Sequence, residues 1–156
     1  MLAQSIIESA AQRLHAAEKT RKQVRQISLD HPEITIPDAY AIQKAWIGLK
    51  LAEGQKIVGH KIGLTSRAMQ QSSQINEPDF GTLLDEMVYK DAAEIPCARF
   101  IDPMIEVELA FILKQRLEGD QVTIFDVLSA TDYVIPALEI IDARCHRIDP
   151  ESNRPR

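Results

Sequence analysis

Hydrophobic residues in the first third of the chain recur at helical spacing over two segments. In residues 2–26 they form one stripe, made of Ala3, Ile6, Ile7, Ala10, Ala11 and Leu14. In the second segment, Thr35 can cap a helix, Pro37 suits its first turn and Gly54 can end it. The pattern therefore predicts two long helices, over residues 2–26 and 36–53, each with one buried face.

After Gly54 the pattern changes to the shorter period of strands. Residues 56–64 combine β-branched side chains with glycines, which is typical of a strand whose backbone bends or admits a ligand closely. Ser66 can cap a short helix, and residues 76–81 are dense in turn-forming residues. Short strands are expected over residues 82–89 and around Phe100.

The second half of the chain predicts a strand, a loop, a helix and a further strand. The loop covers residues 114–121, the helix residues 122–133, and the buried strand residues 137–142. Because helices come first and the strands follow with mixed connections, we expect an α+β fold in a single domain over residues 1–156.

Residues 105–113 carry the most distinctive pattern. Successive side chains of a strand point to opposite faces, so five apolar residues are expected on the core side, and Glu106 and Glu108 together on the other. The apolar five are Ile105, Val107, Leu109, Phe111 and Leu113. Two carboxylates about 7 Å apart repel each other unless a cation lies between them, and a hard divalent ion is the usual solution. This segment alone leaves open that both are ordinary surface acids on a solvated face.

Three further positions could take part in chemistry. Glu139 lies in an apolar run, so it could complete a three-carboxylate cage for Mg2+ or Mn2+, or form a salt bridge with Arg144 or a lysine. Lys61, between glycines, could bind an anion or transfer a proton, or be merely solvated. Asp79 could be a general base, or an acid that stabilises the 76–81 turn.

Composition narrows the class of protein. The chain has 156 residues, a formal net charge of −5 and 45% hydrophobic residues, which is ordinary for a globular protein of one domain. Its basic residues are scattered, so we expect no nucleic-acid partner, and no apolar run is long enough to span a membrane. Cys97 and Cys145 are far apart and are expected to be reduced thiols. A cytoplasmic location is expected.

Four motifs in order resemble the hydratase/decarboxylase family of meta-cleavage pathways, within the fumarylacetoacetate hydrolase-like superfamily. They are residues 59–66, 77–81, 103–111 and 132–139. Residues 141–150 are most similar to the branch of that family that acts on seven-carbon dicarboxylates in homoprotocatechuate degradation. The resemblance covers the chain from its first helix to its last residue.

The resemblance implies a lyase that needs Mg2+ (or Mn2+), with Glu106, Glu108 and Glu139 as the metal ligands. It implies addition of water to a 2-hydroxydienoate dicarboxylate to give a 4-hydroxy-2-oxo acid. Lys61 would contact the substrate carboxylate or the enolate, and Asp79 would transfer a proton. The alternatives are a decarboxylase of the 4-oxalocrotonate type, or an inactive fragment.

The far carboxylate of such a dicarboxylate needs a second cation, for which His60 and Arg67 are candidates. The resemblance also implies that the mixed β-structure is of the fumarylacetoacetate hydrolase C-terminal-like type, and that the protein is a homo-oligomer. Residues 149–156 are predicted to be a loop, and members of the family continue beyond this point. We therefore expect the fold to be incomplete at its C-terminus and the chain to be a truncated gene product or a gene fragment.

Overall fold

A computed structural model describes residues 1–151 of the chain, and these divide into two compact units. Unit 1 comprises Met1–Ile101 and the described part of Arg144–Arg156, and unit 2 comprises Asp102–Ala143. Residues 152–156, the end of the predicted 149–156 loop, lie outside the described residues. The α+β class is confirmed, because helices and small antiparallel sheets occur together. A single domain over the whole chain stays a prediction.

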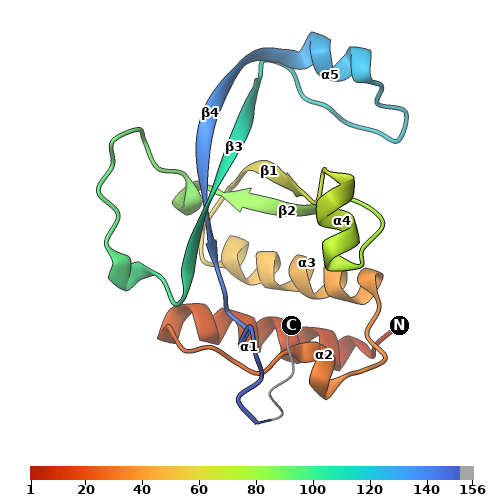
Figure 1. Ribbon diagram of the computed structural model, residues 1–156, viewed down its shortest axis with the longest axis vertical. Coiled ribbons are helices and arrows are strands. Elements are labelled where there is room, and N and C mark those ends of the chain that lie inside the picture. The colour runs from red at the N-terminus through yellow and green to blue at the C-terminus, as the bar shows by residue number, and fades with distance from the viewer. Residues whose placement is uncertain (152–156) are drawn as a thin grey trace. The chain divides into compact units, whose positions relative to one another are not determined.

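Two long helices, α1 (Gln4–Thr20) and α3 (Ile36–Ala52), lie side by side and enclose the core of unit 1 (Figure 1). The buried apolar residues that pack together in this core are Leu2, Ile7, Ala10, Ala11, Ile42, Trp46, Ile47 and Leu84. Most of the stripe predicted on α1 therefore faces this core. No helix among the described residues is both long and apolar enough to cross a bilayer.

The first helix is shorter than residues 2–26 predicted. It ends at Arg21, which adopts a left-handed backbone conformation, and a short helix, α2 (Ile27–Asp30), follows. The chain leaves the helix because Val24 pairs with a segment distant in sequence: its N–H donates to Arg144 O at 2.9 Å, and its carbonyl accepts from His146 N at 3.0 Å. Backbone groups used in this parallel bridge cannot also continue a helix.

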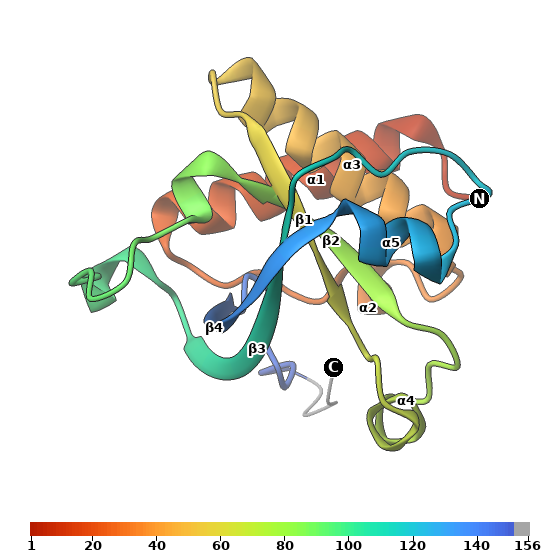
Figure 2. The ribbon, with the colours of Figure 1, turned by 90° about the horizontal axis from the view of Figure 1, so that it is seen from above.

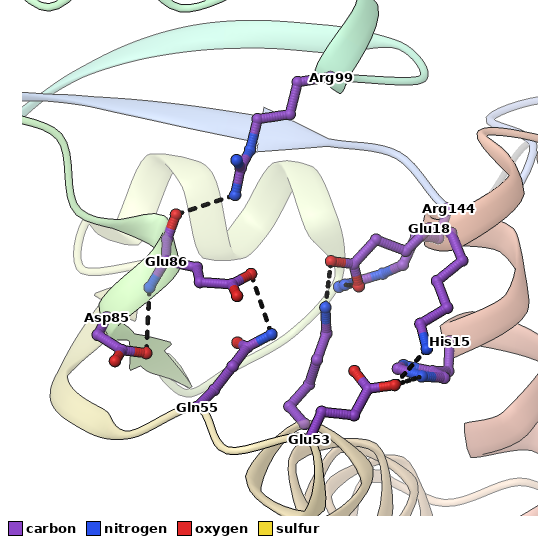
Figure 3. Close-up of polar contacts among 10 residues, drawn as sticks. His15, Glu18, Glu53, Gln55, Asp85, Glu86, Arg99 and Arg144 are labelled. Carbon is purple, nitrogen blue, oxygen red and sulfur yellow. Dashed lines mark hydrogen bonds and ion pairs between the residues drawn. The ribbon is translucent and has the colours of Figure 1, made fainter.

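Ion pairs and hydrogen bonds hold the helices of unit 1 to each other and to the segment after Arg144 (Figure 3). Glu18 on α1 pairs with Lys50 of α3 at 2.5 Å and with Arg144 at 3.6 Å. The Arg144 guanidinium also lies 4.2 Å from the ring centre of Trp46. Glu53 accepts from Lys19 and His15, and these contacts, led by that from Lys19, lower the pKa of Glu53.

The start of α3 is fixed by a buried carboxylate. Thr35 and Asp38 form the predicted cap, in which each side chain accepts a hydrogen bond from the other residue's backbone N–H. The second oxygen of Asp38 accepts from Leu2 N at 2.8 Å, although the residue is only 1% exposed. The hydrogen bond from the Thr35 hydroxyl, followed by that from Leu2, holds the pKa of Asp38 below its usual value.

Stability should therefore fall in acid in a way that depends on Asp38. A carboxyl whose pKa is lower in the folded state contributes stability above its unfolded value, about 4, and this contribution is lost as pH falls through the folded pKa. We expect Asp38→Asn to be less stable than wild type at pH 7 and to lose less stability between pH 4 and pH 2, measured by urea unfolding. Glu33→Gln, at an exposed acid nearby, is the control and should follow wild type. Equal acid slopes for wild type and Asp38→Asn would contradict this account.

Strands β1 (Ile57–Gly63) and β2 (Asp79–Leu84) form an antiparallel pair beside α3 (Figure 2). Phe80 fixes the pair to the helix: its ring stacks on Tyr40 with centroids 4.3 Å apart, and its carbonyl accepts from Gln43. Helix α4 (Arg67–Ser73) lies between β1 and β2 in the sequence and begins at the predicted cap, Ser66.

Two strand predictions in this region are wrong in place. The strand expected over 82–89 begins three residues earlier, and Asp85–Met87 form a 3-10 turn (η1), where Asp85 accepts from Lys56 N. The segment before Phe100 is a second 3-10 turn, Cys97–Arg99 (η2), held by Arg99 N donating to Pro96 O. A proline cannot donate to a ladder, which favours a turn at this point.

Unit 2 is a twisted antiparallel ribbon of β3 (Pro103–Leu113) and β4 (Thr131–Asp142), with α5 (Ile124–Ala130) in the connection (Figure 1). The helix predicted over 122–133 begins after its Thr123 cap but gives way to strand at Thr131. The apolar face of β3 was expected to be buried, and this is wrong for the described chain: Val107 is 82% exposed. A two-stranded ribbon is one layer, and burial of a face needs a second.

Candidate functional site

The predicted metal ligands converge on one face of the unit 2 ribbon. Glu106 and Glu108 are two residues apart on β3, so their side chains share a face. The antiparallel register places Glu139 of β4 directly opposite Glu106, and Ala137 opposite Glu108. One carboxylate oxygen from each glutamate lies within 4.8 Å of the other two. Two neighbouring acids and one more than thirty positions later in the chain therefore lie close together, as the sequence predicted, and their role as metal ligands stays a prediction.

This arrangement fits a divalent cation with oxygen ligands. Two oxygens bound on opposite sides of one Mg2+ are roughly 4.2 Å apart, and around Ca2+ they are roughly 5 Å apart. The observed limit of 4.8 Å lies within that range, so a single ion could contact all three side chains with small rotations. Ala137, the neighbour opposite Glu108, leaves the face open around the acids. Glu106 and Glu108 are exposed and Glu139 is half-buried, so a bound ion would stay accessible to solvent or substrate.

Arg144, the alternative ion-pair partner considered for Glu139, contacts Glu18 and the ring of Trp46 in unit 1. Glu139 is also half-buried, which is less complete burial than its apolar surroundings in the sequence suggested. The desolvation cost that we expected for Glu139 is therefore smaller, and the two neighbouring glutamates repel its carboxylate.

Lys61 and Asp79 form a second group, in unit 1. Asp79 was predicted to be in a turn, and it is instead the first residue of β2, where it pairs with Gly63 of β1. Lys61 is opposite Gly81, so Lys61 and Asp79 are diagonal neighbours on the same face, with Nζ and Oδ1 3.9 Å apart. Because the adjacent Phe80 contacts α3, this face is the one directed away from that helix.

The Asp79 carboxylate is unevenly exposed. Its side chain is 48% exposed, yet its Oδ1 atom is buried and accepts no hydrogen bond from any residue that the structure describes. Lys61 is nearby but beyond hydrogen-bond distance from that oxygen. A buried oxygen left in this state is costly in a purely structural residue and is more typical of a group that binds or reacts.

The two candidates for binding a far carboxylate lie elsewhere. His60 is adjacent to Lys61 on β1, so its side chain projects from the opposite face of the strand pair, where it is exposed. The structure therefore does not bring His60 into the group formed by Lys61 and Asp79. Arg67 is the first residue of α4 and is exposed.

Sequence reasoning missed the part that Gly81 plays in this group. A Cβ atom added to Gly81 would lie 3.1 Å from Cγ and 3.2 Å from Cδ of Lys61. A Cβ atom added to Gly63 would lie 2.3 Å from Asp79 Oδ1 and 3.0 Å from Lys61 Nζ. One pattern in the sequence could have indicated this role: a glycine stands two residues after Lys61 and another stands two residues after Asp79.

Comparison with curated proteins finds hydratases and a decarboxylase. The chain is 66% identical over 146 residues to 2-oxo-hept-4-ene-1,7-dioate hydratase of Escherichia coli, covering 94% of this chain and 55% of that protein. It is 41% identical to 2-hydroxyhexa-2,4-dienoate hydratase of Comamonas testosteroni, with 88% and 53% covered. It is 39% identical to 4-oxalocrotonate decarboxylase of Pseudomonas putida, with 86% and 51% covered. The chain thus spans about half the length of these curated relatives. No family model matches it.

Solved structures agree with these relatives. The chain superposes on 4-oxalocrotonate decarboxylase from Pseudomonas putida G7, complexed with magnesium and adipate, with a TM-score of 0.87 and 35% identity, covering 93% of this chain and 55% of that one. A second structure of that enzyme is complexed with calcium and acetate. The chain belongs to the hydratase/decarboxylase family that these proteins represent, as its four motifs indicated.

Metal binding at the three glutamates is testable without any assay of activity. We expect Mn2+, used as the probe, to bind with an affinity that falls by about a hundredfold or more in Glu106→Gln, because even outer-shell changes cost ten- to a hundredfold. The melting temperature without metal should rise in Glu106→Gln, since one of three repelling charges is gone, and its increase on adding Mn2+ should disappear.

The matched control is Glu118→Gln, which removes an exposed carboxylate of the same unit that pairs with Arg116. It should leave both the Mn2+ affinity and the metal-induced rise in melting temperature unchanged. If both glutamine variants bind Mn2+ as tightly as wild type, the cluster is not a metal site.

Proposed function

We propose that the protein is a divalent-metal-dependent hydratase that adds water to a 2-oxo-enoate dicarboxylate of the 2-oxo-hept-4-ene-1,7-dioate type, formed from its 2-hydroxydienoate, and yields a 4-hydroxy-2-oxo acid. The observation that carries the proposal is the convergence of Glu106, Glu108 and Glu139. The 66% identity to a hydratase named for that substrate supports hydration over decarboxylation, for which the identity is 39%.

We assign the metal site to the three glutamates. When bound there, a divalent ion supplies Lewis-acid polarisation of the substrate's C2 oxygen, which makes C4 electrophilic. Mg2+ is the ion we propose, with Mn2+ as its substitute. The complexes of the structural neighbour with magnesium and with calcium support a divalent metal in general. The glutamates themselves would hold and orient the ion. Because Glu106 and Glu108 are exposed, the ion would keep coordination positions open for a chelating substrate.

Lys61 is proposed to contact the substrate carboxylate, or the oxygen on which negative charge develops as water adds. Its ammonium is a compact charge on a flexible stem, suited to an anion. It lies 3.9 Å from Asp79 Oδ1, so both groups could face one substrate. The 2-hydroxydienoate is first protonated at C5 and loses the proton of its C2 hydroxyl, which gives a 2-oxo-3-enoate with its double bond at C3–C4. Water then adds across that bond, with hydroxide at C4 and a proton at C3. Asp79 is proposed to transfer a proton at its inward oxygen, Oδ1.

The far carboxylate of the substrate is proposed to contact Arg67 rather than His60, because His60 projects from the face of the strand pair opposite to Lys61. A guanidinium matches a carboxylate with two parallel hydrogen bonds, which favours Arg67. A homo-oligomer, implied by the family resemblance, is also part of the proposal.

The proposal predicts that the purified protein, supplied with Mg2+ and the enzymatically generated dienol, removes the dienol absorbance and forms a 4-hydroxy-2-oxo acid that retains all the carbon. Glu106→Gln should slow this by roughly a thousandfold or more, because Lewis-acid stabilisation contributes several kcal/mol. Glu118→Gln should keep wild-type rates.

Product analysis separates the two reactions of the family. Release of carbon dioxide with loss of one carbon would show the decarboxylase, which is the second candidate because the chain superposes on such an enzyme. Loss of dienol that is equally fast in wild type and Glu106→Gln would reject both metal-dependent readings.

A further inference from the structure

We infer that Gly63 and Gly81 are positioning residues that hold Lys61 and Asp79 in their reactive arrangement by leaving space where any side chain would displace them. This inference rests on the proposed function for the roles of Lys61 and Asp79. The geometric part of it, that two glycines determine where an ammonium and a carboxylate lie, stands on the contacts of unit 1 alone.

The register of β1 and β2 makes the arrangement possible. Lys61 faces Gly81 across the pair, and Asp79 faces Gly63, so each functional residue has a glycine as its direct partner. Directly opposed residues have Cβ atoms about 4.5–5.5 Å apart, and a side chain on either glycine would occupy the space between Lys61 and Asp79. With hydrogen at both positions, the diagonal pair can approach to 3.9 Å.

The two glycines act on different atoms. The stem of Lys61 lies over Gly81, since Cγ and Cδ are 3.1 and 3.2 Å from where a Cβ would be. The charged ends lie over Gly63, where a Cβ would be 2.3 Å from Asp79 Oδ1 and 3.0 Å from Lys61 Nζ. Gly81 thus determines the path of the lysine stem, and Gly63 determines the position of the carboxylate.

Backbone conformation does not explain why residues 63 and 81 are glycines. The described glycines with a positive φ are Gly54 and Gly119, both outside β1 and β2. An alanine could therefore adopt the backbone of Gly63 or Gly81, and the obstacle to it is the neighbouring side chain. Gly59 is the matched control: it lies on the same face of β1, and its added Cβ would meet only Leu83 Cδ1, at an ordinary 3.9 Å.

Stability measurements test the geometry without relying on activity. Gly59→Ala should leave the melting temperature unchanged or raise it slightly, because alanine restricts the unfolded chain. Gly63→Ala should lower it by about 2–4 °C, since the Asp79 carboxylate must leave its place. In an Asp79→Ala background the obstructing oxygen is absent, so the loss caused by Gly63→Ala should shrink to less than half.

Kinetics of the same variants test the positioning role. Gly63→Ala should lower kcat by the same factor as Asp79→Ala while KM changes little, and the double variant should be no slower than Asp79→Ala. Gly81→Ala, which moves the lysine stem, should chiefly raise KM. Gly59→Ala should match wild type in both constants.

The two kinds of failure are distinguishable. If wild type shows no turnover of the dienol, the proposed function is wrong, and the melting-temperature cycle still decides the geometry. If the effect of Gly63→Ala on melting temperature is the same with and without Asp79, the inference is overturned. Equal kinetic losses in Gly59→Ala and Gly63→Ala would overturn it as well.

Discussion

The register of the β3–β4 ribbon is the constraint on which the candidate site depends. Antiparallel pairing places Glu139 directly opposite Glu106, and the period of two along β3 brings Glu108 to the same face. A shift of one residue in either strand would turn every glutamate of that strand to the other face of the ribbon, which carries Val107 and Leu138. Three carboxylates within 4.8 Å of one another repel, and a divalent cation bound between them would offset that repulsion.

Unit 1 carries a second pair of candidate functional residues, Lys61 and Asp79, on the β1–β2 strand pair. The two long helices and the Arg144 guanidinium pack around Trp46. Helix α3 holds the β1–β2 pair through the stacking of Tyr40 on Phe80. With one face of the pair fixed on α3, Lys61 and Asp79 project from the other face over bare glycine backbone. The ordered pair therefore results from cross-strand register, as the glutamate cluster does in unit 2.

Local signals in the sequence were sufficient for the starts of two helices and for the shared face of Glu106 and Glu108. The caps at Thr35 and Ser66 are short-range hydrogen-bonding patterns, and both occur where predicted. The alternation around Glu106 fixed its face relative to Glu108 because a strand has only two faces. The pairing of Glu139 with these acids followed from the desolvation argument and the family resemblance, and the structure confirms their closeness.

The remaining features depend on contacts that a local pattern does not contain. The first helix stops early because Val24 bonds to residues more than a hundred positions away, and Asp79 leaves its turn because Gly63 pairs with it. The wrong prediction for the apolar face of β3 has the same cause. Apolar and polar residues alternate along β3 as they do in a half-buried strand, but the apolar face is exposed in the described chain. Gly81 was overlooked because its effect is exerted across the sheet on Lys61.

The central claim is that one divalent ion is shared by three side chains from two strands. Anomalous diffraction at the manganese edge from crystals grown with Mn2+ tests this most directly. The account predicts a single strong peak within bonding distance of oxygens from Glu106, Glu108 and Glu139, at roughly 2.2 Å. A peak that lies elsewhere, or one contacted by the β3 glutamates while Glu139 turns away, would contradict it.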